Sequence, residues 1–401
     1  METSDRYLSA REAAGRLGVS LATLYAYVSR GLLRSEEGAG ERRARRYYAE
    51  DVEALLARKE YRREPHRVAE SALNYGAPVL ESAITLIQDG RLYYRGYDAL
   101  ALAQQQSVEA TAALIWLDRL DAGDLFVRAV AQAPTMTPTV DAGRHPIAAY
   151  QMALARAALD DVAAYLTTPE AVAATGARIL TLLVACTTGQ AVTLPLVHAL
   201  QHAWAPTQPD AAPLLSAALI LCADHELNVS TFTVRSVASA GATPYDAVIA
   251  GLAALHGHRH GGHIARVTAL LHAAAADLPG AVKGFLARGE ALPGFGHRLY
   301  PDGDPRARLL LTLAATHRPN APVVQLAQAL CALVQQTLAL HPTIDLALEV
   351  IAQALALPPA AALAIFALGR TIGWIGHAGE QYANGQLIRP RARYIGRQAT
   401  T

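Results

Sequence analysis

The segment 293–306 reads Pro-Gly-Phe-Gly-His-Arg-Leu-Tyr-Pro-Asp-Gly-Asp-Pro-Arg in a chain of 401 residues. It combines a histidine, acidic groups and arginines with glycines, which let the backbone approach a ligand closely. Two earlier segments have the same character: residues 223–231 read Ala-Asp-His-Glu-Leu-Asn-Val-Ser-Thr, and residues 255–263 read Leu-His-Gly-His-Arg-His-Gly-Gly-His. Helix ends next to glycine also leave backbone N–H groups that attract an anion. We therefore expect all three segments to contact a ligand.

Four of the 14 histidines, His256, His258, His260 and His263, are close enough in sequence to raise the question of a zinc site. Histidines spaced i, i+4 can share one helix face and bind zinc. Glycines interrupt this helix, however, and no cysteine or carboxylate lies close by in the sequence. We therefore predict no metal site and no tightly bound cofactor.

From residue 67 onward the sequence is typical of packed helices. Hydrophobic residues, mostly Ala and Leu, make up 52% of the chain and aromatic residues only 6%. Such a composition favours helices over sheets. One hairpin is predicted at residues 87–95, where Asp89-Gly90 separates two short apolar or aromatic runs. The sequence contains no G-x-G-x-x-G motif or phosphate-binding loop, so nucleotide-dependent redox and kinase chemistry are unsupported.

The cysteines and apolar runs bear on the compartment. Cys186, Cys222 and Cys331 are odd in number, widely spaced and set in apolar helical segments, which predicts reduced core thiols. The apolar runs 214–223 and 351–368 end in charge or are broken by prolines before the roughly 18 residues that a membrane span needs. The first residues lack the apolar stretch of a signal peptide. We expect a cytoplasmic protein with no membrane partner.

The first 67 residues form a separate unit by charge and by motif. They carry 14 Lys and Arg against 11 Asp and Glu, a net charge of +3, which leaves −2 for the remainder of a chain with a total of +1. Ser9 stands three residues before Glu12, a capping box that starts a helix. Gly18 and Ser20 then supply a turn and a second N-cap, and the helix 21–30 follows. Two short helices around a glycine turn predict a helix-turn-helix.

A basic, aromatic strand at residues 42–48 and a further helix at 51–59 complete this unit, which resembles the small winged helix-turn-helix of the MerR/excisionase type. In that type the second helix enters the major groove and the wing contacts phosphates. The resemblance implies DNA contacts by the following residues: Thr23, Tyr25, Arg42, Arg43 and Arg45. A net charge of +3 is modest for a DNA-binding domain, and a domain that mediates protein contacts is the alternative.

The remainder of the chain resembles citrate synthase. The resemblance rests on 223–226 with Asn228 and Ser230, the turn 260–262, the segment 294–298 with 304–306, and the C-terminal stretch 388–394; residues 94–98 and 370–377 agree with the bacterial form. These elements occur in order from about residue 68 to the C-terminus. The resemblance implies a mainly α enzyme that forms a homodimer. It also implies large and small all-α domains in residues 68–401, with the small domain at roughly 260–345. A winged helix-turn-helix at 1–67 precedes them.

The resemblance also implies a reaction and its residues. An acyl-CoA condenses with oxaloacetate, which needs a base for the acyl carbon, a donor for the enol and a donor for the keto oxygen. The matching catalytic residues are Asp345 as the base, His260 at the thioester carbonyl and His297 at the keto oxygen. Carboxylates of oxaloacetate are implied to bind His225, Arg306, Arg370 and, across a dimer interface, Arg389; the backbone near Leu292 and Gly294 is implied to hold the CoA adenine.

Two departures from the family pattern leave the substrate open. After His260-Gly261-Gly262 the family usually continues with Ala, Asn and an acidic residue, whereas this chain has His263, Ile264 and Ala265; Pro301 replaces a basic residue. Acetyl-CoA and propionyl-CoA differ by one methylene, worth about 1–3 kcal/mol in a pocket. Citrate synthesis is the first hypothesis and 2-methylcitrate synthesis the alternative. A DNA-binding regulator whose synthase-like body senses a CoA ester or oxaloacetate is a third hypothesis from a different class.

Overall fold

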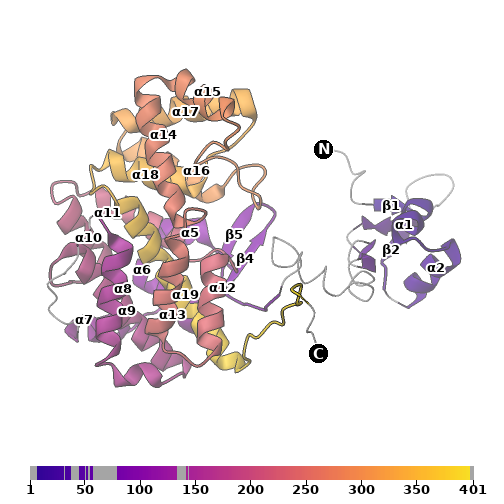
Figure 1. Ribbon diagram of the computed structural model, residues 1–401, viewed down its shortest axis with the longest axis horizontal. Coiled ribbons are helices and arrows are strands. Elements are labelled where there is room, and N and C mark those ends of the chain that lie inside the picture. Colours follow the sequence, from indigo (N-terminus) through magenta and orange to yellow (C-terminus); the bar gives the residue numbers. More distant parts are fainter. Residues whose placement is uncertain are drawn as a thin grey trace. The chain divides into compact units, whose positions relative to one another are not determined.

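The computed structural model describes residues 7–30, 32–37, 45–49, 51–52, 55–56, 79–132, 141–142 and 144–397. The chain divides into two compact units, Met1–Glu81 and Ser82–Thr401 (Figure 1). The predicted DNA contacts Arg42 and Arg43 lie outside the described residues.

The described residues of the first unit include two short helices and a three-stranded sheet. Its elements are β1 (Tyr7–Ser9), α1 (Ala10–Leu17), α2 (Leu21–Ser29), β2 (Ser35–Glu37) and β3 (Arg45–Tyr48). The antiparallel sheet has the order β1-β3-β2. Leu17 and Leu24 from the helices pack with Tyr47 of β3 and with Val52 in its core. The predicted helix-turn-helix and basic strand are thus present, whereas β1 and β2 were not predicted.

Local sequence explains the helix boundaries of this unit. The Ser9 hydroxyl accepts the Glu12 N–H at 3.3 Å, and the Glu12 carboxylate accepts the Ser9 N–H at 2.8 Å, which confirms the capping box. Gly18 ends α1 with a left-handed φ of 59°, and Ser20 caps α2. Of the predicted helix 51–59, residues 51, 52, 55 and 56 are helical, and the others lie outside the described residues.

The second unit begins with a small sheet of β4 (Thr85–Gln88), β5 (Arg91–Tyr94) and β6 (Tyr97–Asp98), paired antiparallel in that order. Asp89 and Gly90 connect β4 to β5 with positive φ angles of 52° and 71°. Two such residues form the tight turn whose twist matches that of paired strands. The hairpin predicted at 87–95 is therefore confirmed.

Helices make up most of the second unit. They are α5 (Ala99–Gln105), α6 (Val108–Leu117), α7 (Leu125–Ala131), α8 (Pro146–Ala158), η1 (Val162–Tyr165), α9 (Pro169–Thr188), α10 (Leu196–Trp204), α11 (Ala211–Cys222), α12 (Val229–Ser239), α13 (Pro244–Leu255), η2 (Gly261–His263), α14 (Ile264–Ala276), α15 (Leu278–Ala287), α16 (Pro305–His317), α17 (Pro322–Leu338), α18 (Ile344–Ala354) and α19 (Ala361–Asn384).

The long helix α19 organises this unit. It packs against α9, α11, α12 and α13, and α18 also touches it. Helices α14 to α18 gather together at one end, the upper part of Figure 1. Of the three ligand-contacting segments predicted from the sequence, one lies between α11 and α12, one joins α13 to α14 and so connects the two groups of helices, and one lies between α15 and α16.

Two helices, α9 and α19, are long and apolar enough to cross a membrane by length and composition. The sequence predicts a run too short for a span at 351–368, whereas α19 extends to Asn384. In α19, however, 94% of the most apolar 18-residue window is buried inside the protein, and in α9 72% is buried. Both helices therefore have the burial of core helices.

Glycines let α19 approach the turn after α11. The Gly373 N–H donates to the Ala223 carbonyl at 3.0 Å, and a Cβ at this position would overlap that carbonyl and lie 2.5 Å from the Asp224 carboxylate. We expect Gly373→Ala to destabilise the protein by about 1–3 kcal/mol or more, as overpacking does. Gly379→Ala on the same helix is the matched control, because its Cβ would meet only Val172 at 3.6 Å.

Urea unfolding checks this prediction. The control gains helix propensity and should be neutral or up to about 1 kcal/mol more stable. Equal midpoints for both variants would show that the close approach at Gly373 is unimportant.

Candidate active site

Six predicted side chains converge in the second unit from six different elements. His225 lies in the turn between α11 and α12, His260 immediately before η2, and His297 between α15 and α16. Arg306 and Asp345 stand in the first turns of α16 and α18, and Arg370 lies midway along α19. The charge of Arg306 acts to lower the pKa of His225, His297 and Asp345, and the charge of Arg370 acts to lower the pKa of His225 and His260.

Two histidines and a tyrosine form one side of the cluster. The ring centroids of His225 and His297 are 5.3 Å apart, and those of His297 and Tyr300 are 5.0 Å apart. His225 Nε2 and the Tyr300 hydroxyl are 3.1 Å apart and share a hydrogen bond. Burial first, and then the positive charge of Arg306, lowers the pKa of both histidines below the usual value. Both rings are therefore neutral at physiological pH.

The tautomer of His297 follows from its backbone contact. The Leu299 N–H donates to His297 Nδ1 at 3.2 Å. In a neutral imidazole the other nitrogen then carries the proton. Nε2–H of His297 is thus a hydrogen-bond donor with no recorded partner among the described residues.

Asp304 clamps Arg306 and caps two helices. Its carboxylate oxygens accept Arg306 Nε and Nη2, each at 2.9 Å, so that the pairing is bidentate. It also accepts the backbone N–H of Arg306 at 3.0 Å and that of Ile344 at 3.1 Å. Burial opposes ionisation of Asp304, but the Arg306 charge and hydrogen bonds prevail and hold its pKa below the usual value. This one carboxylate therefore places both Arg306 and the start of α18.

Arg370 is buried with a single recorded hydrogen bond. Its Nε donates to the Cys222 carbonyl at 2.8 Å, and its guanidinium lies 5.0 Å from the centroid of the Phe366 ring. Within the described part of the chain, its terminal Nη donors have no hydrogen-bond partner. The same holds for Nη1 of Arg306. Two buried arginines with unused donors form a site for an anion with fixed geometry.

His260 is held by Ser230 beside Phe366. Its Nε2 and the Ser230 hydroxyl oxygen are 2.9 Å apart, and the two rings meet edge-on with centroids 5.8 Å apart. Burial first, and then Arg370, lowers the pKa of His260 to about 4. The ring is therefore neutral, and Nδ1 is the nitrogen that faces no recorded protein partner in the described chain.

Asp345 is a carboxyl group whose environment makes it a stronger base. Burial raises the pKa of Asp345 above the usual value, while His263, the Thr343 hydroxyl and Arg306 act in the opposite direction. The Thr343 hydroxyl donates to its carboxylate at 3.2 Å. A buried carboxylate with a raised pKa is the expected form of a general base.

The other predicted contacts lie outside this cluster. Arg389 is exposed in the segment after α19, which Ile388 anchors by donating its N–H to Ser239 at 3.1 Å. Leu292 is buried. The Gly294 N–H donates to His263 Nε2 at 3.3 Å, and the Gly294 carbonyl accepts the Thr343 N–H at 2.8 Å. Both backbone groups of Gly294 are therefore already paired within the protein.

The sequence alone assigns no role to three residues of the site, which are Ser230, Asp304 and Tyr300. An Asp before a proline is a common N-cap signal, so the capping of α16 by Asp304 was open to prediction. The contacts of Ser230 with His260 and of Tyr300 with His225 join residues 30 and 75 positions apart, and no local pattern predicts them.

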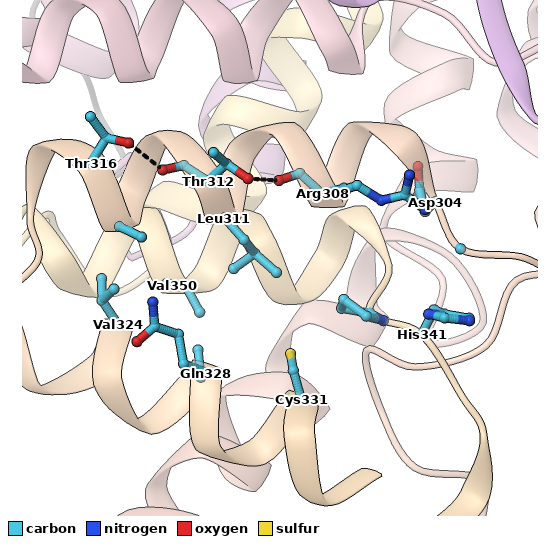
Figure 2. A pocket seen from close by; sticks show the side chains of 14 residues that line it. Asp304, Arg308, Leu311, Thr312, Thr316, Val324, Gln328, Cys331, His341 and Val350 are labelled. Atoms are coloured by element: carbon cyan, nitrogen blue, oxygen red, sulfur yellow. Dashed lines mark hydrogen bonds between the residues drawn. The ribbon is translucent and has the colours of Figure 1, made fainter. Parts of the chain in front are cut away.

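A cavity of about 570 Å³ borders the cluster between α16, α17 and α18. Figure 2 shows Leu311, Val324 and Cys331 along its walls, with Asp304 and His341 at one end. Asp304, the partner of Arg306, lines this cavity, whereas none of the predicted catalytic side chains, His260, His297 and Asp345, lines it. Cys186 and Cys222 are buried, as the sequence predicted, whereas Cys331 is half-buried at this cavity. In the described residues, no group of three or more His, Cys, Asp or Glu side chains could hold a metal ion.

Comparison with known proteins decides the family. The family model of the citrate synthase C-terminal domain matches residues 73–391. The chain belongs to the citrate synthase family. A helix-turn-helix domain model matches residues 7–60, which agrees with the fold of the first unit. This citrate synthase family member thus carries a helix-turn-helix before its family domain, and the family is one of transferase-type condensing enzymes.

Individual relatives agree with this assignment. Citrate synthase 2 of Bacillus subtilis is 28% identical over 362 residues, which cover 80% of this chain and 94% of the relative. A Mycobacterium tuberculosis relative is 39% identical over 186 residues, and there the chain spans about half of the relative: 44% of this chain and 49% of that protein. The crystal structure of citrate synthase from Pyrobaculum aerophilum matches with a TM-score of 0.67 and 26% identity, over 80% of this chain and 91% of that one.

Proposed function

We propose that this chain condenses acetyl-CoA with oxaloacetate and water to give citrate and free CoA. The observation that carries the proposal is the single buried cluster of Asp345, His260 and His297 with two arginines that have unused donors. Oxaloacetate is a dicarboxylate with a keto group, and it fits Arg306 and Arg370 for the carboxylates and His297 for the keto oxygen. His225 is proposed as a further contact.

Proton transfer starts the reaction. Asp345 takes a proton from the acyl methyl group, and burial supports this step because a raised pKa makes the carboxylate a stronger base. The negative charge moves to the thioester oxygen, where the neutral ring of His260 donates a hydrogen bond. Ser230, whose hydroxyl donates to Asn228 Oδ1 at 2.7 Å, holds this ring with its oxygen 2.9 Å from Nε2.

Bond formation then consumes the keto group. The acyl carbon attacks the keto carbon of oxaloacetate, and Nε2–H of His297 donates a hydrogen bond to the keto oxygen as it becomes an alkoxide. The alkoxide then takes up a proton, equivalent to the one that Asp345 removed from the methyl group, and becomes the alcohol. Water afterwards breaks the thioester bond, leaving a carboxylate and CoA thiol. The lowered pKa of His297 suits this role, because it keeps the ring neutral, with Nε2–H as a hydrogen-bond donor and Nδ1 as the acceptor of the Leu299 N–H.

A thiol-trapping assay tests the function. Oxaloacetate is mixed with acetyl-CoA or, separately, with propionyl-CoA, and release of free CoA is followed. We expect the larger kcat/KM with acetyl-CoA; a larger value with propionyl-CoA would make 2-methylcitrate the product. Release with neither acyl-CoA would overturn the proposal and leave the sensor hypothesis.

The proposed function includes an oligomeric state and a cellular compartment. We propose a homodimer in which Arg389 reaches the partner's site, supported by the exposed apolar side chains Leu387, Tyr394 and Ile395 on its segment. We propose that the small domain spans roughly residues 260–345, which include α14 to α17, and that it closes on the substrates. The free thiols support a reducing compartment, the cytoplasm. Sedimentation equilibrium that shows a monomer would contradict the dimer.

DNA binding by the first unit is a second candidate function, favoured by one concave surface. Arg11 of α1, Tyr25 of α2 and Arg45 of β3 line a hollow of about 650 Å³ together with the buried Tyr47. Tyr25 is 51% exposed, and the Tyr47 hydroxyl has no hydrogen-bond partner among the described residues. Thr23 is half-buried on the same helix. Arginine and tyrosine donors converging on a hollow suit a DNA phosphate.

Salt-dependent binding checks this function. We expect Arg11→Ala and Arg45→Ala each to weaken binding to duplex DNA and to reduce the slope of log affinity against log salt by about one. Arg128→Ala on α7 is the control with the same change in charge, at an exposed side chain of the other unit. Binding that is absent at low salt, or equal in all variants, would favour a protein-contact role for this unit.

A further inference from the structure

His225, the proposed further contact for oxaloacetate, lies in a turn whose backbone needs support from the rest of the fold. The next residue, Glu226, has a left-handed φ of 52° although it is not glycine. Such a conformation persists only where surrounding contacts hold it. The His225 ring has a defined place: its Nε2 lies 3.1 Å from the Tyr300 hydroxyl, and the ring meets that of His297 edge-on. The direction of this ring therefore depends on what anchors the turn.

Asp224, the residue directly before His225, is the buried anchor of this turn. Its side chain is fully buried, and Oδ2 accepts two hydrogen bonds, from the Thr85 hydroxyl at 2.6 Å and from His377 Nε2 at 3.2 Å. Oδ1 has no hydrogen-bond partner in the described part of the chain. One donor from β4 and one from α19 thus hold the carboxylate, and loss of either leaves a buried polar group poorly paired.

His377 is itself held in the orientation that serves Asp224. Its Nε2 carries the proton, because the Asp224 carboxylate can only accept. Its Nδ1 lies 3.5 Å from Nη1 of Arg235, which can only donate, so Nδ1 is the unprotonated nitrogen. Arg235 is almost fully buried and donates to Glu380 at 2.9 Å and to Gln381 at 2.8 Å. The fold thus presets His377 as a donor to Asp224.

We propose that His377 is a positioning residue for oxaloacetate: through Asp224 it holds the turn that directs His225 toward the keto acid. The proposal rests on the proposed function, because His225 is a substrate contact there. Its consequence is confined to one substrate. Oxaloacetate affinity depends on His377, whereas acyl-CoA affinity does not.

Three variants test the proposal. His377→Leu removes one donor to Asp224, and Thr85→Val removes the other from a different element. In both we expect the KM for oxaloacetate to rise on the order of 3- to 10-fold, as for one lost hydrogen bond, with the KM for acyl-CoA within about twofold. His377→Gln keeps an N–H donor and should restore most of the oxaloacetate affinity. Thr85→Val decides the matter if His377→Leu does not fold.

Tyr150→Phe is the matched control. It also removes one hydrogen bond of a buried side chain, the bond to Thr187, but between α8 and α9. We expect it to lower the melting temperature with both KM values unchanged, which is the result that a merely structural role of His377 would also give. A KM for oxaloacetate that is unchanged in Thr85→Val and in folded His377→Leu would therefore overturn the proposal.

Calorimetric titration with oxaloacetate alone separates failure of this proposal from failure of the proposed function. Binding that weakens in Thr85→Val and His377→Leu, in a protein that releases no CoA, retains the positioning role and overturns the condensation. CoA release with unchanged dissociation constants in both variants overturns the positioning role alone. Absence of oxaloacetate binding to the unchanged protein overturns both.

Discussion

Asp345→Asn should lower kcat by about 10²–10⁴-fold, the usual contribution of a general base. The amide cannot take a proton from the acyl carbon, yet it keeps the size and position of the side chain at the start of α18. Oxaloacetate affinity should stay within about twofold, because the proposed oxaloacetate contacts are Arg306, Arg370 and His297. Equal loss of kcat and oxaloacetate binding would show a structural role instead.

The same variant has a predicted effect on stability. Burial raises the Asp345 pKa in the folded state above that of the unfolded chain. Between these two values the folded state binds more protons, so stability falls as the pH rises. At neutral pH the ionised carboxylate therefore destabilises the fold, and Asp345→Asn should melt at the same or a higher temperature. A higher melting temperature together with lost turnover is the signature of a base.

Glu349→Gln is the matched control for Asp345→Asn. Glu349 is another buried carboxyl on α18, one turn further along, and burial raises its pKa as well. Its carboxylate accepts the Gln353 side-chain N–H at 2.8 Å within the helix. We expect this variant to retain kcat. Loss of activity in both variants would point to the helix rather than to Asp345.

Asp304→Asn should be the most destabilising single substitution in the site. The amide nitrogen replaces the oxygen that accepts from Arg306 Nη2 and from the Ile344 N–H. Both of these donors then face the amide NH₂ group, which is itself a donor. Breaking one member of a buried ion pair costs about 3–5 kcal/mol. We expect a lower urea midpoint and, in the protein that remains folded, a weaker affinity for oxaloacetate, because Arg306 loses its clamp.

The stability of the wild-type protein should depend on pH through the Asp304–Arg306 pair. The Asp304 pKa is lowered in the folded state, so its contribution to stability is present at neutral pH and is lost as the pH falls through that lowered value. Asp302→Asn, at an exposed residue two positions earlier, is the control. Equal urea midpoints for the two variants would contradict the clamp.

Local signals predicted the local structure. Capping by Ser9 and Ser20, the Gly18 turn and the Asp89-Gly90 hairpin each depend on a few neighbouring residues, and the structure contains all of them. The strands β1 and β2 have three residues each, too short for an alternating pattern to be visible. The apolar run 351–368 does not correspond to one helix, because α18 ends at Ala354 and α19 begins at Ala361 and continues to Asn384.

The site itself needed the family resemblance. Arg370 Nε bonds the Cys222 carbonyl from 148 residues away, and Asp304 bonds the Ile344 N–H from 40 residues away. Periodicity carries no information on such contacts. His263 departs from the family pattern, but only the structure shows that its Nε2 accepts the Gly294 N–H.

The most direct test of the condensation uses acetyl-CoA labelled with ¹³C at both acetyl carbons. The protein is incubated with this substrate and oxaloacetate, and the products are identified by mass spectrometry. We predict citrate that carries both labels, in an amount equal to the CoA released. Labelled acetate with unlabelled oxaloacetate left intact would show thioester hydrolysis without carbon–carbon bond formation and would contradict the account.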